Sequence, residues 1–132
     1  MSMADDNAIG RVTGLGGIFV LSAGTDRLTT WYRDTLGLAV ETWGGARFAD
    51  EDRPTGSASL WGVFCEKSDY LAPSSRDFMI NFIVDNMDLM IARLEAKGVP
   101  ILGRDDGDDN GRFIWVLDPD GTKIELWQPP RD

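Results

Sequence analysis

The chain has 132 residues and a net charge of −9 at pH 7, and 42% of its residues are hydrophobic. This length and apolar content suit one domain with its own core. No apolar run approaches the roughly 18 residues of a membrane span, and the acidic start MSMADDNAIG has no apolar signal segment. We therefore expect a cytoplasmic protein without a membrane partner. Nucleic acid is not expected as a partner either, because the acidic balance repels phosphates.

Histidine is absent and Cys65 is the only cysteine. Without histidine, the chain lacks the usual side chain for proton transfer at neutral pH and the commonest metal ligand. A single cysteine excludes an intrachain disulfide and makes a thiolate metal site improbable. These counts argue against a transition-metal centre.

The first half predicts a strand, a helix and three further strands. Residues 1–10 form a polar tail, which we expect to be disordered, and the apolar, β-branched run from Val12 to Leu21 predicts a buried strand. Apolar residues at helical spacing then continue to Gly37, which suits the end of a helix. The remaining predicted segments are strands at 38–43, 46–48 and 58–66, a loop at 51–57 and a linker at 67–76.

The second half repeats this order. A strand at 78–84 precedes a helix that Asp85 or Asn86 caps and that Lys97-Gly98 ends. A short strand at 99–102 and an acidic loop at 104–111 follow. That loop matches the opening of a calcium-binding loop but has Leu117 at the twelfth position in place of a glutamate, so we interpret it as a solvated loop able to act as a lid. Strands at 113–117 and 124–127 complete the half.

An internal duplication explains the repeated order. Leu28 and Gly37 stand 61 residues before Leu89 and Gly98, and the same offset relates Phe64 to Glu125. A duplication predicts both the matching residues and the matching elements. We therefore predict an α+β fold in which two βαβββ modules, at 11–66 and 77–129, form one domain. Their strands would make an open, cup-like mixed β-sheet barrel with the helices outside.

The stretch DPDGTKIELW carries the first candidate for chemistry. Asp118 to Gly121 supply turn residues between two apolar runs, which predicts a hairpin. In its second strand, Lys123, Glu125 and Trp127 share one face. A carboxylate on a buried sheet face must open onto solvent, a ligand or a metal. We consider Glu125 a general base or an anchor for a cationic substrate; pairing with Lys123 is the alternative.

Four motifs give the chain a family resemblance: GLGGIFV, WYRDTLGL, NFIVDNMDLMIARLEAKGV and DPDGTKIELWQP. In this order they resemble the vicinal oxygen chelate superfamily, which contains glyoxalase I, bleomycin-resistance proteins and extradiol dioxygenases. The resemblance runs from about Arg11 to Pro129. It implies paired βαβββ modules, an open cup between them and frequent dimerisation, so a homodimer is expected. It does not decide the function, because the scaffold hosts lyases, isomerases, oxygenases and drug-sequestering proteins.

The resemblance also implies where a metal would be held. Where ligand histidines commonly stand in the first and fifth strands, this chain has Gly17 and Met79, and the fourth-strand position is Phe64. Only the final-strand glutamate, Glu125, is kept. No transition metal is therefore expected. Glu125 with Glu66 could still hold Mg²⁺ or Mn²⁺ together with waters.

The remaining candidates are residues that would line the cup. Trp127 and Trp61 are the favoured aromatic pair, with Trp115 and Phe64 beside them, and Asn81 is either a ligand hydrogen-bonding group or an amide satisfied within the protein. We expect a protein that binds a small organic molecule, aromatic or cationic. A glyoxalase-type lyase or isomerase using Glu125 is the alternative, and a dioxygenase is the weakest candidate because its iron site needs histidines.

Overall fold

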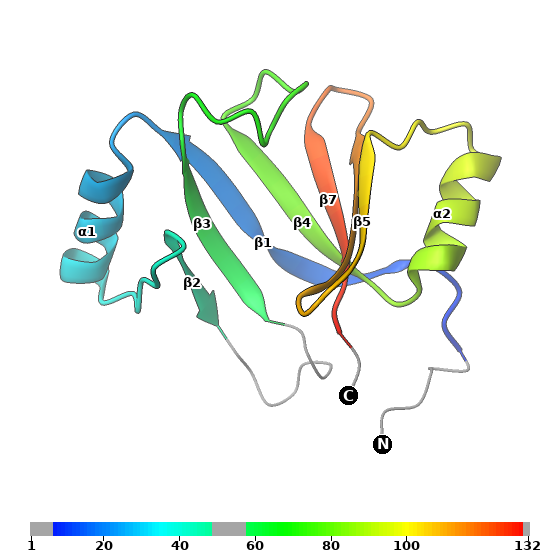
Figure 1. Cartoon of the computed structure of the whole chain (residues 1–132), viewed down its shortest axis with the longest axis horizontal. Helices are drawn as coiled ribbons and strands as arrows, with labels where there is room; N and C mark the ends of the chain where they lie inside the picture. Colours follow the sequence, from blue (N-terminus) through cyan, green and yellow to red (C-terminus); the bar gives the residue numbers. More distant parts are fainter. Residues whose placement is uncertain (1–6, 49–57, 131–132) are drawn as a thin grey trace.

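The computed structural model describes residues 7–48 and 58–130, and all the described strands belong to one mixed sheet in the order β2-β3-β1-β4-β7-β6-β5. The strands are β1 (Val12–Ser22), β2 (Gly45–Phe48), β3 (Ser59–Cys65), β4 (Phe78–Val84), β5 (Gly103–Asp108), β6 (Gly111–Leu117) and β7 (Lys123–Gln128). The helices are α1 (Thr25–Leu36) and α2 (Met87–Ala96), at opposite ends of the curved sheet in Figure 1. The predicted α+β fold is confirmed. Within the described ranges, no helix is long and apolar enough to cross a membrane.

The two halves meet edge to edge in the middle of the sheet. β1 runs parallel to β3, and β4 runs parallel to β7. β1 and β4 join the halves as an antiparallel pair, with Gly17 opposite Asn81. The first and last segments of each half are thus sheet neighbours, which the proposed duplication predicts and which brings the late strand β7 beside the centre.

The first half lacks one predicted strand. Residues 38–43 form no strand, because the chain folds back on itself: Glu41 donates its N–H to Gly45, and Gly44 donates to Glu41. Gly44 has φ +97°, which a glycine adopts without a steric penalty. Hydrogen bonds within this turn use backbone N–H and C=O groups that a strand would have paired with a neighbouring strand. β2 therefore forms the open edge of the sheet.

In the second half, the short strand after α2 lies later in the chain than predicted. β5 lies at Gly103–Asp108, so the predicted strand at 99–102 and the predicted acidic loop at 104–111 are both wrong. β5 pairs with β6, with Asp105 opposite Phe113. Acidic residues suit an edge strand, since much of its surface faces water. Asp106 there pairs with Arg104 and Arg112 at 2.7 and 2.9 Å.

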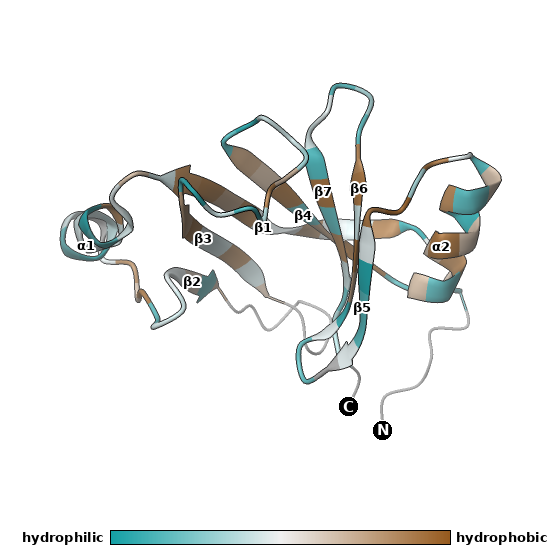
Figure 2. Cartoon of the chain, turned by 45° about the horizontal axis from the view of Figure 1, so that its top comes forward, coloured by the Kyte–Doolittle hydropathy of each residue, from teal (hydrophilic) through white to brown (hydrophobic). Residues whose placement is uncertain are grey.

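The main core lies under α2. Met87 and Met90 of α2 pack with Val84, Ile114 and Leu126 of the sheet, all at most 4% exposed. Asn86 caps this helix by accepting from the N–H of Leu89 at 3.0 Å. At the other end of the sheet, Gly37 ends α1 with φ +76°, as predicted. Figure 2 shows brown, hydrophobic residues on the central strands and on part of α2, whereas much of β5 is teal, hydrophilic.

The segment before β1 is held on the domain by hydrogen bonds. Ile9 and Arg11 donate backbone N–H groups to the Asp85 carboxylate at 3.1 and 2.8 Å, and Arg93 donates to the carbonyl of Gly10 at 2.7 Å. Partial burial alone would raise the pKa of Asp85, but these N–H groups lower it. Residues 9 and 10 therefore pack on the domain, although they belong to the predicted tail; residues 1–6 lie outside the described part.

Candidate functional site

Glu125 is a buried carboxylate surrounded by hydrogen-bond donors. Its side chain on β7 is 3% exposed. Oε1 accepts from Asn81 Nδ2 at 2.7 Å, and Oε2 accepts from Trp115 Nε1 at 2.8 Å and from the hydroxyl of Tyr70. A carboxylate has about four acceptor positions. The described residues fill three of them, and the fourth, on Oε1, has no recorded donor.

The sheet register brings two of these donors to Glu125. Asn81 is its parallel neighbour on β4, and Trp115 is its antiparallel neighbour on β6. Side chains of neighbours in register project from the same face, so both reach the carboxylate. The third donor, Tyr70, comes from the segment between β3 and β4, where Leu71 is buried at 2% exposure and fixes the chain over the sheet. The predicted linker is thus a packed part of the site.

Lys123 does not pair with Glu125 as the alternative interpretation expected. Its ammonium donates to the backbone carbonyl of Tyr70 and lies 5.2 Å from the centre of the Tyr70 ring. Burial lowers the pKa of Lys123, while the charges of Glu125 and Asp69 act in the opposite direction. The pKa of Tyr70 is raised by burial, by the Glu125 charge and by the hydrogen bond to Glu125. Because its pKa is raised, the Tyr70 phenol stays protonated and can donate to Glu125.

A cavity of about 430 Å³, here called the cup, opens above Glu125. Its lining is mainly aromatic and apolar, with a few polar groups, as is usual for ligand sites. The lining residues are Phe19, Glu41, Trp43, Arg47, Leu60, Phe64, Tyr70, Asn110, Phe113, Glu125 and Trp127. Gly62 makes room for two of these rings, because a Cβ there would lie 2.7 Å from Phe19 and 2.8 Å from Trp43.

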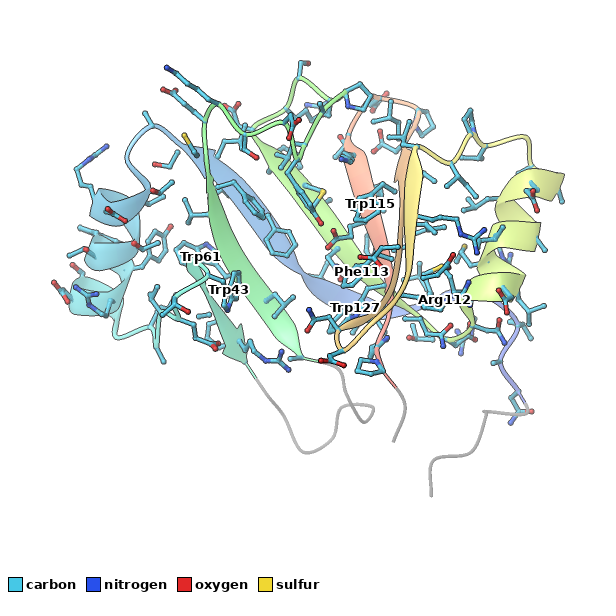
Figure 3. The ribbon with its side chains drawn as sticks, viewed as in Figure 1. Trp43, Trp61, Arg112, Phe113, Trp115 and Trp127 are labelled. Carbon is cyan, nitrogen blue, oxygen red and sulfur yellow. The ribbon has the colours of Figure 1, made fainter. Side chains whose placement is uncertain are left out.

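Most of the predicted binding residues gather here. Trp127 lines the cup and stacks on Phe113, with ring centres 6.1 Å apart. Phe64 also lines it and stacks on Tyr70 at 5.0 Å. Trp115 and Asn81 contact Glu125 directly, and Asn81 is fully buried. In Figure 3, Phe113, Trp115 and Trp127 lie on the β6–β7 side, across from Trp43.

Trp61 lies outside the cup. Its ring is 4.3 Å from that of Tyr32 on α1, and it stands on the α1 side of β3 in Figure 3. Leu60 and Phe64 line the cup, and Trp61, an odd number of positions from each, points to the opposite face of the strand. The prediction that Trp61 joins Trp127 in the cup is therefore corrected: because side chains alternate along β3, Trp61 and Phe64 lie on opposite faces of the strand, and only Phe64 lines the cup.

Several cup residues were not assigned from the sequence. Tyr70 stood in a stretch interpreted as a linker, although a large aromatic residue among serines and charges is itself a signal for packing. Trp43 precedes β2 and Arg47 belongs to it, and both line the cup from the first half of the chain. Phe19 follows the strand pattern of β1, but nothing local shows that it faces a cavity. These residues converge only through the sheet order.

The residues at the positions where the resemblance implies metal ligands do not supply the donors of a transition-metal site. A side chain at Gly17 would place its Cβ 2.1 Å from the carbonyl oxygen of Leu60, and Phe64 and Met79 offer no nitrogen or oxygen ligand. Glu66 is exposed beyond the end of β3, away from Glu125. Among the described residues, no group of three His, Cys, Asp or Glu could hold a metal ion. The donor set does not fit a transition metal.

Comparison with known proteins assigns the family. Residues 14–126 match the model of the Glyoxalase/Bleomycin resistance protein/Dioxygenase superfamily, so the chain belongs to that superfamily. A search of curated proteins found no match.

The fold is shared with solved structures of the superfamily. Methylmalonyl-CoA epimerase from Mycobacterium tuberculosis is 22% identical over 94% of this chain and 91% of its own, with a TM-score of 0.64. A Streptomyces coelicolor methylmalonyl-CoA epimerase is also 22% identical, over 90% of this chain and 99% of its own, with a TM-score of 0.66. A superfamily member from Vibrio splendidus 12B01 is 13% identical over 84% and 95%, with a TM-score of 0.55. The TM-scores show a common fold, and at these identities the comparison shows no more than the fold.

Proposed function

We propose that the chain binds a small organic molecule in the cup, with Glu125 as the polar anchor and without a transition metal. The observation that supports this most directly is the oriented carboxylate, with one open acceptor position, that lines an aromatic cavity. The ligand that fits such a site has a planar apolar part and a hydrogen-bond donor at one end.

The charges favour a cationic donor. Among the described lining residues, Glu125 is the one charged side chain that is buried, while Glu41 and Arg47 are both exposed. Exposed charges are screened by water, whereas a buried carboxylate acts in a lower dielectric. The ring faces of Phe64 and Trp127 also attract cations. An aromatic amine in its ammonium form is therefore the ligand class that we propose.

Isothermal titration calorimetry with a matched pair of probes tests this function. We expect 2-naphthylmethylammonium to bind more tightly than 2-naphthoate, which has the same ring and the opposite charge. In Glu125→Gln the affinity for the cation should fall by roughly 10- to 100-fold, as expected for a hydrogen bond to a charged group. Glu66→Gln, which neutralises an exposed carboxylate, is the control. Equal affinities for both probes would exclude this function.

The alternative is an isomerase that uses Glu125 as a base to remove a proton next to a carbonyl group. The fold shared with methylmalonyl-CoA epimerases favours this reaction type. Arg47 would be the lining cation that stabilises the resulting enolate. Deuterium incorporation at C2 of methylmalonyl-CoA, lost in Glu125→Gln, would establish it. Saturable binding of the naphthyl cation with no exchange would favour the binding protein.

A homodimer is proposed on the outer face of the sheet. Leu15, Ile18 and Phe78 of β1 and β4 are 51%, 41% and 37% exposed, on the face opposite Met79 and the cup. An exposed apolar strip of this kind is suited to pack against the same strip of a second copy in a two-fold dimer. The cytoplasmic location stays a prediction from the sequence.

A further inference from the structure

Lys123 shares a strand face with Glu125 but lines a different cavity. The side chain is 9% exposed and borders a space of about 440 Å³, here called the side cavity. Its other lining residues are Asp69, Tyr70, Ala72, Pro73, Leu102, Gly103 and Trp115. Tyr70 lines both the side cavity and the cup. Lys123 and Glu125 thus lie on opposite sides of Tyr70, which borders both cavities.

The contacts of the Lys123 ammonium converge on Tyr70. Nζ donates a hydrogen bond to the Tyr70 carbonyl, and it lies over the rings of Tyr70 and Trp115, at 5.2 and 5.8 Å from their centres. No ion pair recorded among the described residues joins Nζ to a carboxylate. A buried ammonium is costly unless it is hydrogen-bonded or paired. Here the main chain and ring of one tyrosine supply most of that compensation.

Tyr70 needs such support because no sheet register holds it. It lies between β3 and β4 in a segment of turns, where its N–H donates to Ser68 Oγ at 3.1 Å. Asn81 and Trp115, by contrast, are held opposite Glu125 by strand pairing. Of the three donors to Glu125, Tyr70 is therefore the one whose position depends on contacts other than strand pairing.

We infer that Lys123 is a positioning residue that holds the Tyr70 hydroxyl on Oε2 of Glu125 and so leaves Oε1 as the oxygen open to a ligand. This inference rests on the proposed function of Glu125 as anchor. Lys123 contacts no residue of the cup other than Tyr70 in the recorded hydrogen bonds and ring contacts. Lys123 also lies over the ring of Trp115, the other donor to Oε2, so a variant that lacks the Tyr70 hydroxyl is needed to show that its effect on a ligand passes through Tyr70.

Affinity for 2-naphthylmethylammonium distinguishes positioning from a plain charge effect. Lys123→Met removes a positive charge near Glu125, so a charge effect alone would raise the affinity for a cation. Positioning predicts the opposite, a fall of about tenfold, because the carboxylate loses its fixed orientation. Lys123→Arg keeps a donor and should recover most of the affinity. Lys97→Met, at an exposed site after α2, is the matched control and should change nothing.

A double-mutant cycle tests whether the effect passes through Tyr70. In the Tyr70→Phe background, which lacks the hydroxyl, Lys123→Met should cause no further loss of affinity. The Trp115 indole N–H resonance gives a second measurement without a ligand, since Trp115 shares Oε2 with Tyr70. Because Lys123 also lies over the Trp115 ring, its direct effect on this resonance is measured in the Tyr70→Phe background, and the shift that Lys123→Met causes should be clearly larger when the Tyr70 hydroxyl is present.

The outcomes separate the two proposals. Unchanged or higher cation affinity in a folded Lys123→Met, or equal losses in both backgrounds, would overturn the positioning role. If the unmodified protein does not discriminate between the naphthyl cation and anion, the proposed function fails, while the Trp115 resonance still decides whether Lys123 positions Tyr70. If Lys123→Met does not fold, Lys123→Gln, which keeps a hydrogen-bond donor and loses the charge, replaces it in both measurements.

Discussion

Asn81 and Glu125 stand side by side on the parallel strands β4 and β7, and the Asn81 amide donates to Glu125 Oε1 at 2.7 Å. Within the described residues, the other end of the same amide, Oδ1, is buried without a hydrogen-bond partner. A buried acceptor left unpaired costs about 1–3 kcal/mol. Asn81 thus orients the Glu125 carboxylate, while its own Oδ1 stays without a hydrogen bond.

Glu125→Gln should therefore be tolerated in the fold. The new amide nitrogen can donate to Asn81 once the Asn81 amide turns over and presents Oδ1, and Nδ2 then replaces Oδ1 as the one buried group without a recorded partner, so the number of unpaired groups does not rise. We expect a change in unfolding free energy within about 1 kcal/mol, whereas Glu125→Leu leaves three buried donors unpaired and should cost at least about 3 kcal/mol. Urea denaturation measures both. Equal losses would show that Asn81 does not turn.

Tyr70 should stay protonated well above the ordinary tyrosine pKa of 10.0. A raised pKa in the folded state means that, above pH 10.0, the unfolded chain loses a proton that the folded chain keeps. The stability that Tyr70 contributes is therefore complete below this pH and falls as the pH rises beyond it. Ultraviolet titration of Tyr32→Phe, in which Tyr70 is the only tyrosine, should show phenolate appearing together with unfolding. Titration near pH 10 in the folded protein would contradict this prediction.

The two tryptophans favoured by the sequence should behave differently. Trp127→Leu removes a cup wall and the stacking on Phe113, so we expect affinity for 2-naphthylmethylammonium to fall by about tenfold or more. Trp61→Leu removes packing against Tyr32 on the other face. It should lower stability and leave the affinity within about twofold of the original. Calorimetry and urea denaturation of both variants separate these effects.

Metal removal should not affect the cup. Dialysis against a chelator, followed by addition of Mg²⁺ or Mn²⁺, should leave the affinity for the naphthyl cation unchanged, because the donors around Glu125 are hydrogen-bond donors and not metal ligands. A loss of affinity that manganese restores would show a carboxylate site that includes Glu125.

The proposed dimer can be broken at the centre of its strip. Ile18→Glu would place a charge in the apolar contact, so light scattering should show a dimer for the unmodified protein and a monomer for the variant. Leu102→Glu, at an apolar position that is 43% exposed outside the strip, is the control and should stay dimeric. A monomer at all concentrations for the unmodified protein would exclude the dimer.

Capping and turn residues correctly predicted several boundaries of the helices and strands. Asn86 caps α2, Gly37 ends α1 in the left-handed conformation, and Gly121 turns the β6–β7 hairpin with φ +86°. Each depends on the conformational preference of a few adjacent residues. The same kind of signal failed at residues 38–43, where a local turn replaced a strand, and at β5, where the solvated edge position permits an acidic sequence.

By itself, the sequence determined the repeat, the alternation of β7 and hence the burial of Glu125 on one face with Lys123 and Trp127. Only the tertiary structure decided the partners of that carboxylate. Tyr70 stands 55 residues away in a segment without regular structure, and its contact with Glu125 follows from where the chain crosses the sheet. Strand alternation is a property of the local backbone, but the side chains that meet across a cavity depend on strand order, which no local pattern encodes.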